Sequence, residues 1–274
     1  MLTFEELLSH CTIEPPILPL NRSATFNQMG YVFYSFTPMT QAFIDNEAKV
    51  NHHVLEIGCG FGNVPLAFLK RGIAKYTAMD TEKQHLALLA KRLKEQCGQD
   101  DRITFLHGHA PVDLPQVKHT YDAILIDKVL HFLTPAEIEA FLNWAKGALK
   151  KGGRLYITTV SPHSKIYAEK VLPVYIENVQ KNIPYPGYFE DTDAILDHGK
   201  VQNEHPNHHI PKQLTLFAVK ELSELLANHK FVVSNAHFFV LGNEQDPTWY
   251  TLEESEAEKA QGSLGAVGLC AAYL

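Results

Sequence analysis

Short apolar runs alternate with helical patterns between about residues 50 and 160. The runs with strand character are His53 to Ile57, Tyr76 to Met79, Ile103 to Leu106, Ala123 to Ile126 and Leu155 to Val160. Strand-sized apolar runs separated by helices are typical of βαβ units, which build a parallel sheet with helices on its faces. The pattern therefore predicts an α/β fold with a doubly wound, mostly parallel sheet.

Capping pairs indicate where two of the intervening helices begin. Thr134 with Glu137 supplies an N-cap and its reciprocal acid, and apolar residues then repeat at helical spacing. The glycine pair that starts at Gly152 predicts the end of this helix. Thr81 with Gln84 predicts a second capping box, at the start of the helix that follows the second strand.

The alternation stops at both ends of this region, which divides the chain into four segments. We expect an N-terminal helical cap (1–47), a cofactor-binding core (48–160), a substrate lid inserted after the fifth strand (161–212), and a C-terminal part that completes the sheet (213–274). The cap and the lid are rich in proline and aromatic residues. The last segment predicts a helix near Val219 to His229, followed by strands at Phe231 to Val240 and Gly265 to Leu274.

Composition and charge disfavour some classes of binding partner and indicate the compartment. With 274 residues and 45% apolar content the chain can bury a large core. A net charge of -7 and a pI near 6.1 disfavour nucleic acid and anionic membranes, which both require a basic face. No segment has the length and apolarity of a membrane span or the pattern of a signal peptide. Four distant cysteines (Cys11, Cys59, Cys97 and Cys270) indicate neither disulfides nor a thiolate zinc site, so a reducing cytoplasm is expected.

A glycine-rich turn follows the first strand of the core. Residues 54–62 predict a buried strand that turns through Gly58, Gly60 and Gly62 into a helix. Glycines let the backbone approach a ligand closely, and the next helix offers N–H groups to a polar group. A dinucleotide-binding turn, G-x-G-x-x-G, would place its third glycine where this chain has Asn63. The acid at Glu56 also suits a diphosphate poorly, so the turn favours a cofactor other than NAD.

At these residues the chain resembles the class I, Rossmann-like superfamily of S-adenosylmethionine-dependent methyltransferases. The first motif of that family places an acid and an apolar residue before G-x-G-x-G, as Glu56 and Ile57 stand here. The resemblance covers roughly residues 50–160. It implies a seven-stranded sheet, parallel except for its last strand, with S-adenosylmethionine as cofactor and S-adenosylhomocysteine as product.

The resemblance also implies a set of cofactor-binding residues. These are Glu56, Gly58, Cys59, Gly60, Gly62, Asp80, Thr81, His109, Ala110, Asp127 and Lys128. Asp80 ends the second strand, where the family holds both ribose hydroxyls, and His109 stands where many members carry an aspartate beside the adenine. We expect Glu56, Asp80 and Asp127 to meet at one edge of the sheet. The alternative role for Asp80 and Asp127 is to cap a helix.

His131 is the candidate catalytic residue. It directly follows the fourth strand and resembles the histidine that deprotonates a hydroxyl in small-molecule O-methyltransferases of plants and bacteria. Methyl transfer is an in-line displacement that needs orientation, exclusion of water and, for an acceptor protonated at neutral pH, a base. The alternative is a packed, hydrogen-bonded histidine.

The aromatic cap and lid predict an enclosed, largely apolar pocket, which favours a small or lipid-like methyl acceptor. Two absences support this hypothesis. No [DN]PP[FYW] run follows the fourth strand, and no cysteine between Cys97 and Cys270 could serve cytosine C5 chemistry. We therefore predict transfer to an oxygen or nitrogen atom of a small molecule, with no nucleic acid partner.

No metal ion is expected. The lid carries four histidines (His198, His205, His208 and His209), but they lack the regular spacing that would direct them toward one zinc ion. Asp127 followed by Lys128 is shared with magnesium-dependent catechol-type methyltransferases, a match of only two residues.

Three alternative functions remain open on the sequence. A protein or RNA methyltransferase could take its basic surface from a partner subunit. A protein of the same fold could bind the cofactor without turnover. A nicotinamide-dependent oxidoreductase is the alternative that the glycine spacing disfavours most.

Overall fold

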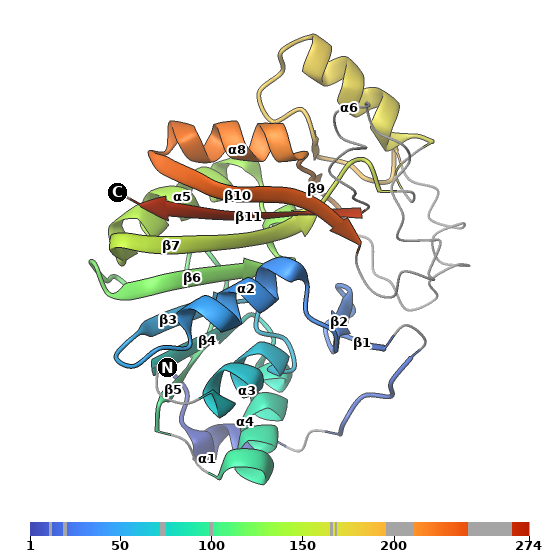
Figure 1. Cartoon of the computed structure of the whole chain (residues 1–274). Helices are drawn as coiled ribbons and strands as arrows, with labels where there is room; N and C mark the ends of the chain where they lie inside the picture. Colours follow the sequence, from blue (N-terminus) through green and yellow to red (C-terminus); the bar gives the residue numbers. More distant parts are fainter. Residues whose placement is uncertain are drawn as a thin grey trace.

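The computed structural model describes residues 1–10, 13–18, 21–71, 75–98, 101–164, 167, 169–195, 211–240 and 265–273. Its central feature is a seven-stranded sheet of order β10-β11-β7-β6-β3-β4-β5 (Figure 1). The strands are β3 (His53–Ile57), β4 (Lys75–Asp80), β5 (Ile103–His107), β6 (Tyr121–Asp127), β7 (Leu149–Val160), β10 (Phe231–Val240) and β11 (Gly265–Tyr273). Six strands of this sheet run in the same direction, and β11 runs opposite to them, between β10 and β7. The predicted fold class is confirmed.

Helices cover both faces of the sheet, and an apolar core lies under each layer. They are α2 (Pro38–Glu47), α3 (Asn63–Lys70) and α4 (Lys83–Cys97) on one face, and α5 (Pro135–Ala148) and α8 (Val219–Asn228) on the other. Buried leucine, isoleucine and aromatic side chains fill the space between each layer and the sheet. Removing this apolar surface from water is the main force that holds such layers together.

Helix boundaries agree with the sequence at one capping box and differ at the other. Thr134 Oγ1 accepts the Glu137 N–H at 3.2 Å, and the Glu137 carboxylate accepts the Thr134 N–H at 2.8 Å. The predicted capping box at Thr81 is wrong. Glu82 is the N-cap of α4 and its side chain accepts the Gln84 N–H at 3.0 Å, because the preceding backbone is held by Asp80.

The glycine pair at Gly152 does not end α5, which stops at Ala148. Strand β7 instead begins at Leu149, six residues before its predicted start, and passes through both glycines. Gly152 has a φ of +76°, and its neighbour Gly153 lies so close to the Lys150 carbonyl that a side chain there would collide with the backbone. The glycines therefore shape an irregular start of β7.

The N-terminal 47 residues contain two helices and a β-hairpin that the prediction of a helical cap did not include. Helix α1 (Phe4–Leu8) packs on α4 at the β5 side of the sheet, whereas α2 crosses β6 and β7. Between them, β1 (Arg22–Ala24) pairs with β2 (Tyr31–Phe33). We call residues 22–33 the hairpin. It lies beyond the carboxyl ends of the parallel strands (Figure 1).

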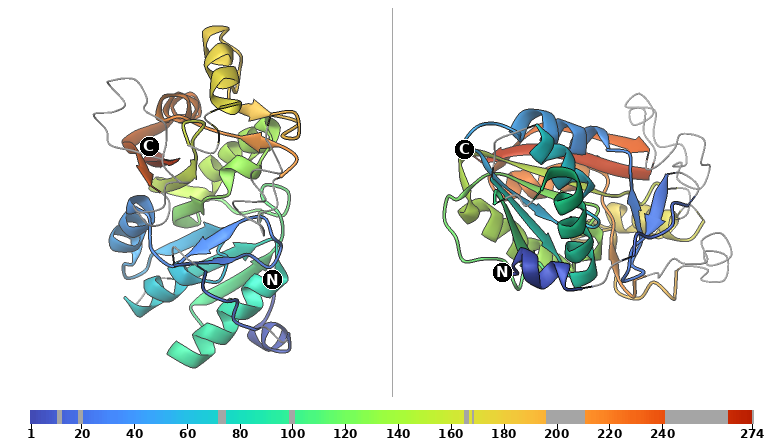
Figure 2. Two further views of the ribbon diagram at one scale, coloured as in Figure 1. Left: turned by 90° about the vertical axis from the view of Figure 1, so that its right-hand side faces the viewer. Right: turned by 90° about the horizontal axis from the view of Figure 1, so that it is seen from below.

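The described part of the insertion after β7 contains α6 (Val171–Gln180) and β8 (Tyr188–Phe189). Strand β8 pairs with β9 (Leu214–Thr215), and α6 projects away from the sheet (Figure 2). The four lid histidines considered as zinc ligands fall within residues 196–210, outside the described residues. Among the helices that the structure describes, none combines the length and the apolar character needed to cross a bilayer.

Candidate functional site

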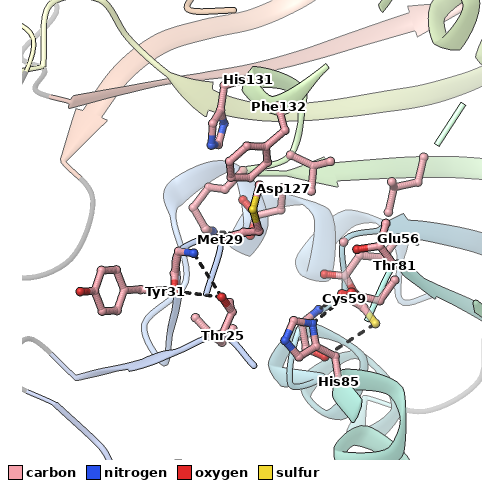
Figure 3. A pocket seen from close by; sticks show the side chains of 18 of the residues that line it. Thr25, Met29, Tyr31, Glu56, Cys59, Thr81, His85, Asp127, His131 and Phe132 are labelled. Carbon is pink, nitrogen blue, oxygen red and sulfur yellow. Dashed lines mark hydrogen bonds and ion pairs between the residues drawn. The ribbon is translucent and has the colours of Figure 1, made fainter. Parts of the chain in front are cut away.

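A cavity of about 300 Å³ lies at the carboxyl ends of β3, β4 and β6. In open α/β sheets this edge is where ligands bind. All of the predicted site residues except Gly62 line the cavity, namely Glu56, Gly58, Cys59, Gly60, Asp80, Thr81, His109, Ala110, Asp127, Lys128 and His131. The structure thus brings together side chains from four separate stretches of sequence (Figure 3).

Asp80 holds the glycine turn and the start of α4 in one arrangement. Its Oδ2 accepts the Gly60 N–H at 2.8 Å, and its Oδ1 accepts the Glu82 N–H at 2.9 Å. Oδ1 is also 3.0 Å from Nδ1 of His85. A carboxylate offers about four acceptor positions, so these three contacts leave about one for a ligand.

Glu56 lines the cavity and is almost completely buried. The pKa of Glu56 is raised to about 8, chiefly by burial and to a smaller extent by the nearby Asp127 charge, while the hydroxyl of Tyr76 opposes the shift. That hydroxyl donates to Glu56 Oε2 at 2.6 Å. With Asp80 and Asp127 on the neighbouring strands, Glu56 makes a site in which a positively charged ligand would relieve repulsion among carboxylates.

The raised pKa of Glu56 predicts a loss of stability as the pH rises. Because its folded pKa lies above the unfolded value, the favourable contribution is complete below pH 4.5 and disappears as the pH passes about 8. A difference of this size is on the order of 5 kcal/mol. We expect the urea-unfolding free energy of the ligand-free protein to fall through this window relative to that of Glu56→Gln, which keeps the Tyr76 contact. Parallel pH profiles for the two proteins would contradict the expectation.

The glycine turn has no room for side chains. Gly58, Gly60 and Gly62 all have positive φ angles, of +78°, +51° and +80°. A Cβ on Gly58 would overlap the Val129 side chain, and one on Gly62 would overlap Leu89 of α4. Gly58 and Gly60 therefore give the cavity a wall of bare backbone, whereas Gly62 allows α3 and α4 to pack closely.

Replacing Gly62 with alanine is expected to destabilise the protein by about 2–4 kcal/mol, through left-handed backbone strain and overlap with three Leu89 atoms. Gly147→Ala in α5 is a matched control, because nothing lies within 4 Å of its added Cβ and helix propensity favours alanine there. Chemical denaturation of both variants measures the difference. Equal stabilities would show that the turn tolerates a side chain at Gly62.

Asp127 and Lys128 form an ion pair at the end of β6. Lys128 Nζ lies 2.5 Å from Asp127 Oδ2, and the Thr158 hydroxyl donates to Asp127 Oδ1. Lys128 has a φ of +57°, and its N–H is directed at the carbonyl and hydroxyl oxygens of Thr158, both at 3.0 Å. The ion pair is thus fixed to β7 from two sides.

The two candidate histidines occupy different environments. His131 is buried in a short 3-10 helix, η1 (Leu130–Phe132), with its ring centroid 4.1 Å from that of Phe132. Figure 3 shows its ring directed into the cavity. His109 has a half-exposed side chain, and its Nε2 lies 3.5 Å from Glu137 at the start of α5.

The sequence placed the N-terminal cap at the pocket but did not identify the hairpin within it, which supplies Thr25, Asn27, Met29, Gly30, Tyr31, Val32 and Phe33. It missed His85, on the first turn of α4, altogether. The only available signal was a histidine among the apolar positions of that helix, five residues after Asp80.

The chain matches a known family over its central part. Residues 54–153 match a family described as "Methyltransferase domain". A curated relative, the ribosomal protein L11 methyltransferase of Syntrophomonas wolfei, is 26% identical over 161 residues, which is 58% of this chain. The match spans 50% of that relative's length.

Solved structures show a similar fold over most of the chain. A protein from Methanosarcina mazei described as a SAM-dependent methyltransferase superposes with a TM-score of 0.60 at 18% identity, covering 88% of this chain and 99% of its own. The geranyl diphosphate C-methyltransferase of Streptomyces coelicolor, solved with S-adenosyl-L-homocysteine, superposes with a TM-score of 0.55 at 14% identity. The match covers 86% of this chain and 78% of that chain.

Proposed function

We propose that this chain, whose central domain is of the class I S-adenosylmethionine-dependent methyltransferase type, transfers a methyl group to an oxygen or nitrogen atom of a small, partly apolar molecule. The resemblance predicted from the sequence is confirmed by the family match and the fold. The observation that carries the proposal is one cavity that joins the carboxylates and glycine turn to an apolar wall.

The residues of the cavity fit S-adenosylmethionine. Gly58 and Gly60 leave bare backbone beside it, and Asp80 keeps about one acceptor position for a ribose hydroxyl. Glu56, Asp80 and Asp127 favour a ligand that carries positive charge, as a sulfonium does. When bound, this cofactor supplies an electrophilic methyl group.

The apolar wall suits the acceptor. Its apolar residues come from the hairpin, from η1 and the residue after it, from the end of β7, and from the segments on either side of them, namely Met29, Val32, Phe36, Phe132, Leu133, Val160, Tyr167 and Leu214. Among the described lining residues, Lys128 is the only lysine or arginine, and Asp127 already neutralises it. The wall therefore favours an uncharged acceptor, and it excludes water from the reacting atoms.

His131 lines the same cavity and is proposed as the general base. An acceptor hydroxyl loses its proton as the methyl group is transferred, and an imidazole is suited to receive it near neutral pH. His131 lies in η1, shortly after the end of β6, and so lines the same cavity as Asp127.

Calorimetric titration with S-adenosylmethionine, S-adenosylhomocysteine and NAD tests the cofactor assignment. We expect micromolar binding of the first two compounds and none of NAD. Binding of NAD alone would reject the proposal in favour of an oxidoreductase.

A second candidate function is methylation of a protein, which the similarity to ribosomal protein L11 methyltransferases favours. Incubating the purified protein with cell extract and radiolabelled S-adenosylmethionine separates the two candidates. Label in low-mass products supports the small-molecule proposal, whereas label confined to protein supports the second candidate.

A further inference from the structure

His85 connects the cofactor side of the cavity to the hairpin. It is the third residue of α4, it is almost completely buried, and it lines the cavity beside Asp80. Nδ1 lies 3.0 Å from Asp80 Oδ1, and Nε2 lies 3.1 Å from the backbone nitrogen of Phe26 at the tip of the hairpin. Both ring nitrogens are therefore engaged, one with Asp80 and the other with the hairpin.

These two partners fix the tautomer of His85. A backbone N–H can only donate, so Nε2 accepts the hydrogen bond from Phe26 and carries no hydrogen. The hydrogen of the neutral ring is then on Nδ1, which donates it to the Asp80 carboxylate. The imidazole thus completes a continuous chain of hydrogen bonds from the Asp80 carboxylate to the Phe26 amide.

Aromatic packing holds the ring in this orientation. The His85 ring centroid is 5.2 Å from that of Phe61, in the glycine turn, and 5.6 Å from that of Phe26. Phe26 and Phe61 are themselves 5.2 Å apart. The three rings join the hairpin tip to the glycine turn, so a movement of the hairpin tip would displace the rings that pack on the glycine turn, and the reverse.

Asp80 is the point where this connection meets the cofactor site. Its other contacts are the Gly60 N–H and the Glu82 N–H, which position the glycine turn and the start of α4. A ribose hydroxyl that donates to the remaining acceptor position would draw negative charge away from the other Asp80 contacts. The hydrogen bond between Asp80 and His85 would change in strength as a result. The hairpin tip at the far end of the connection supplies Thr25, Asn27 and Met29 to the cavity.

We propose that His85 is a positioning residue that couples occupation of the cofactor site to docking of the hairpin over the cavity. This inference rests on the proposed function, because it takes S-adenosylmethionine or its product as the ligand beside Asp80. Coupling between two sites is reciprocal, so a docked hairpin tightens cofactor binding by the same factor as the cofactor tightens docking.

The test is hydrogen exchange of the hairpin amides, Phe26 above all, with and without saturating S-adenosylhomocysteine. In the unmodified protein we expect the ligand to slow exchange about tenfold, within the usual range for coupled sites. In His85→Asn the amide nitrogen keeps the donation to Asp80 but the side chain is too short to reach Phe26. The ligand-induced change should fall to nearly none, and the dissociation constant for S-adenosylhomocysteine should rise about tenfold.

Two further variants separate coupling from simple stabilisation. His85→Phe retains the packing on Phe26 and Phe61 while removing both hydrogen bonds, and it should also abolish the ligand-induced change. Ser23→Ala loosens the hairpin itself, since Ser23 Oγ contacts the Pro16 carbonyl at 2.8 Å and Tyr34 at 3.0 Å. Its hairpin should exchange faster throughout, yet keep the tenfold ratio.

Three results would contradict, in turn, the role of His85, the coupling to the hairpin and the proposed function. If His85→Asn keeps the ligand-induced ratio, His85 is only a structural residue and the inference is wrong. If S-adenosylhomocysteine binds the unmodified protein without changing hairpin exchange, the inference fails while the proposed function stands. If S-adenosylhomocysteine does not bind, the proposed function itself fails.

Discussion

Replacing Asp80 with asparagine is expected to weaken S-adenosylhomocysteine binding by about 100-fold, which corresponds to about 2.7 kcal/mol. The Asp80 carboxylate accepts hydrogen bonds from Gly60 on one oxygen and from Glu82 and His85 on the other. In asparagine one of these two oxygens is replaced by an NH₂ group, which would face the donors on that side. A donor facing a donor loses the hydrogen bond and leaves buried groups unpaired. The position proposed for the ribose hydroxyl also loses its charge.

Asp122→Asn is the matched control for this experiment. Asp122 likewise accepts a backbone N–H, from His53 at 2.7 Å, and contacts Lys150, but it lies at the amino end of β6, away from the cavity. Its substitution should lower stability slightly and leave ligand affinity unchanged, as measured by calorimetry. If Asp80→Asn also bound the ligand normally, Asp80 would be a helix-start residue and nothing more.

Replacing His131 with glutamine is expected to lower the turnover number by about 10²- to 10⁴-fold for a hydroxyl acceptor, the usual contribution of a general base. Glutamine retains polarity and similar size but cannot take up a proton. Because the Asp80 contacts are untouched, affinity for S-adenosylhomocysteine should stay within about twofold, a difference of under 0.5 kcal/mol. Initial rates at saturating cofactor, combined with calorimetry, separate the two quantities.

The corresponding control is His119→Gln. His119 is an exposed histidine before β6, whose Nδ1 contacts the Leu149 carbonyl at 2.9 Å at the opposite end of the strand. We expect normal turnover from this variant. A His131→Gln protein with normal turnover on a hydroxyl acceptor would show that His131 serves only to pack the cavity wall.

The core of the fold could be predicted because its signals are local. Each buried strand between residues 53 and 160 shows as a short apolar run, and parallel topology brings their carboxyl ends to one edge. Glu56, Asp80 and Asp127 therefore line one cavity, as their positions at strand ends indicated. The Thr134 capping box is likewise decided within four residues.

The errors arise where distant groups compete for the same backbone. At Thr81, the Asp80 side chain takes the Glu82 N–H and moves the start of α4 one residue beyond the sequence estimate. At Gly152, pairing with β6 on both sides of the glycines extends β7 through them, although the local sequence there predicts the end of a helix. Neither competition is visible in a short window of sequence.

The hairpin within the cap, and its contact with His85, could not be predicted for a related reason. Phe26 and His85 are 59 positions apart, and neither has a local motif that names the other as its partner. In sequence, His85 looks like one of the inward-facing residues of α4, and the hairpin looks like part of a capping segment. Only the packing of the hairpin against the end of the sheet brings these residues to the cavity.

The position of β11 has a consequence for how the chain assembles during synthesis. The ribosome produces β10 before β11, yet β10 meets the rest of the sheet only through β11, which pairs with β7 on its other side. Until residues 265–273 have left the ribosomal tunnel, β10 has no place in the sheet and the open edge of β7 is exposed. Premature termination just before β11 would thus release a chain with two unsatisfied strand edges, a substrate for chaperones and proteases.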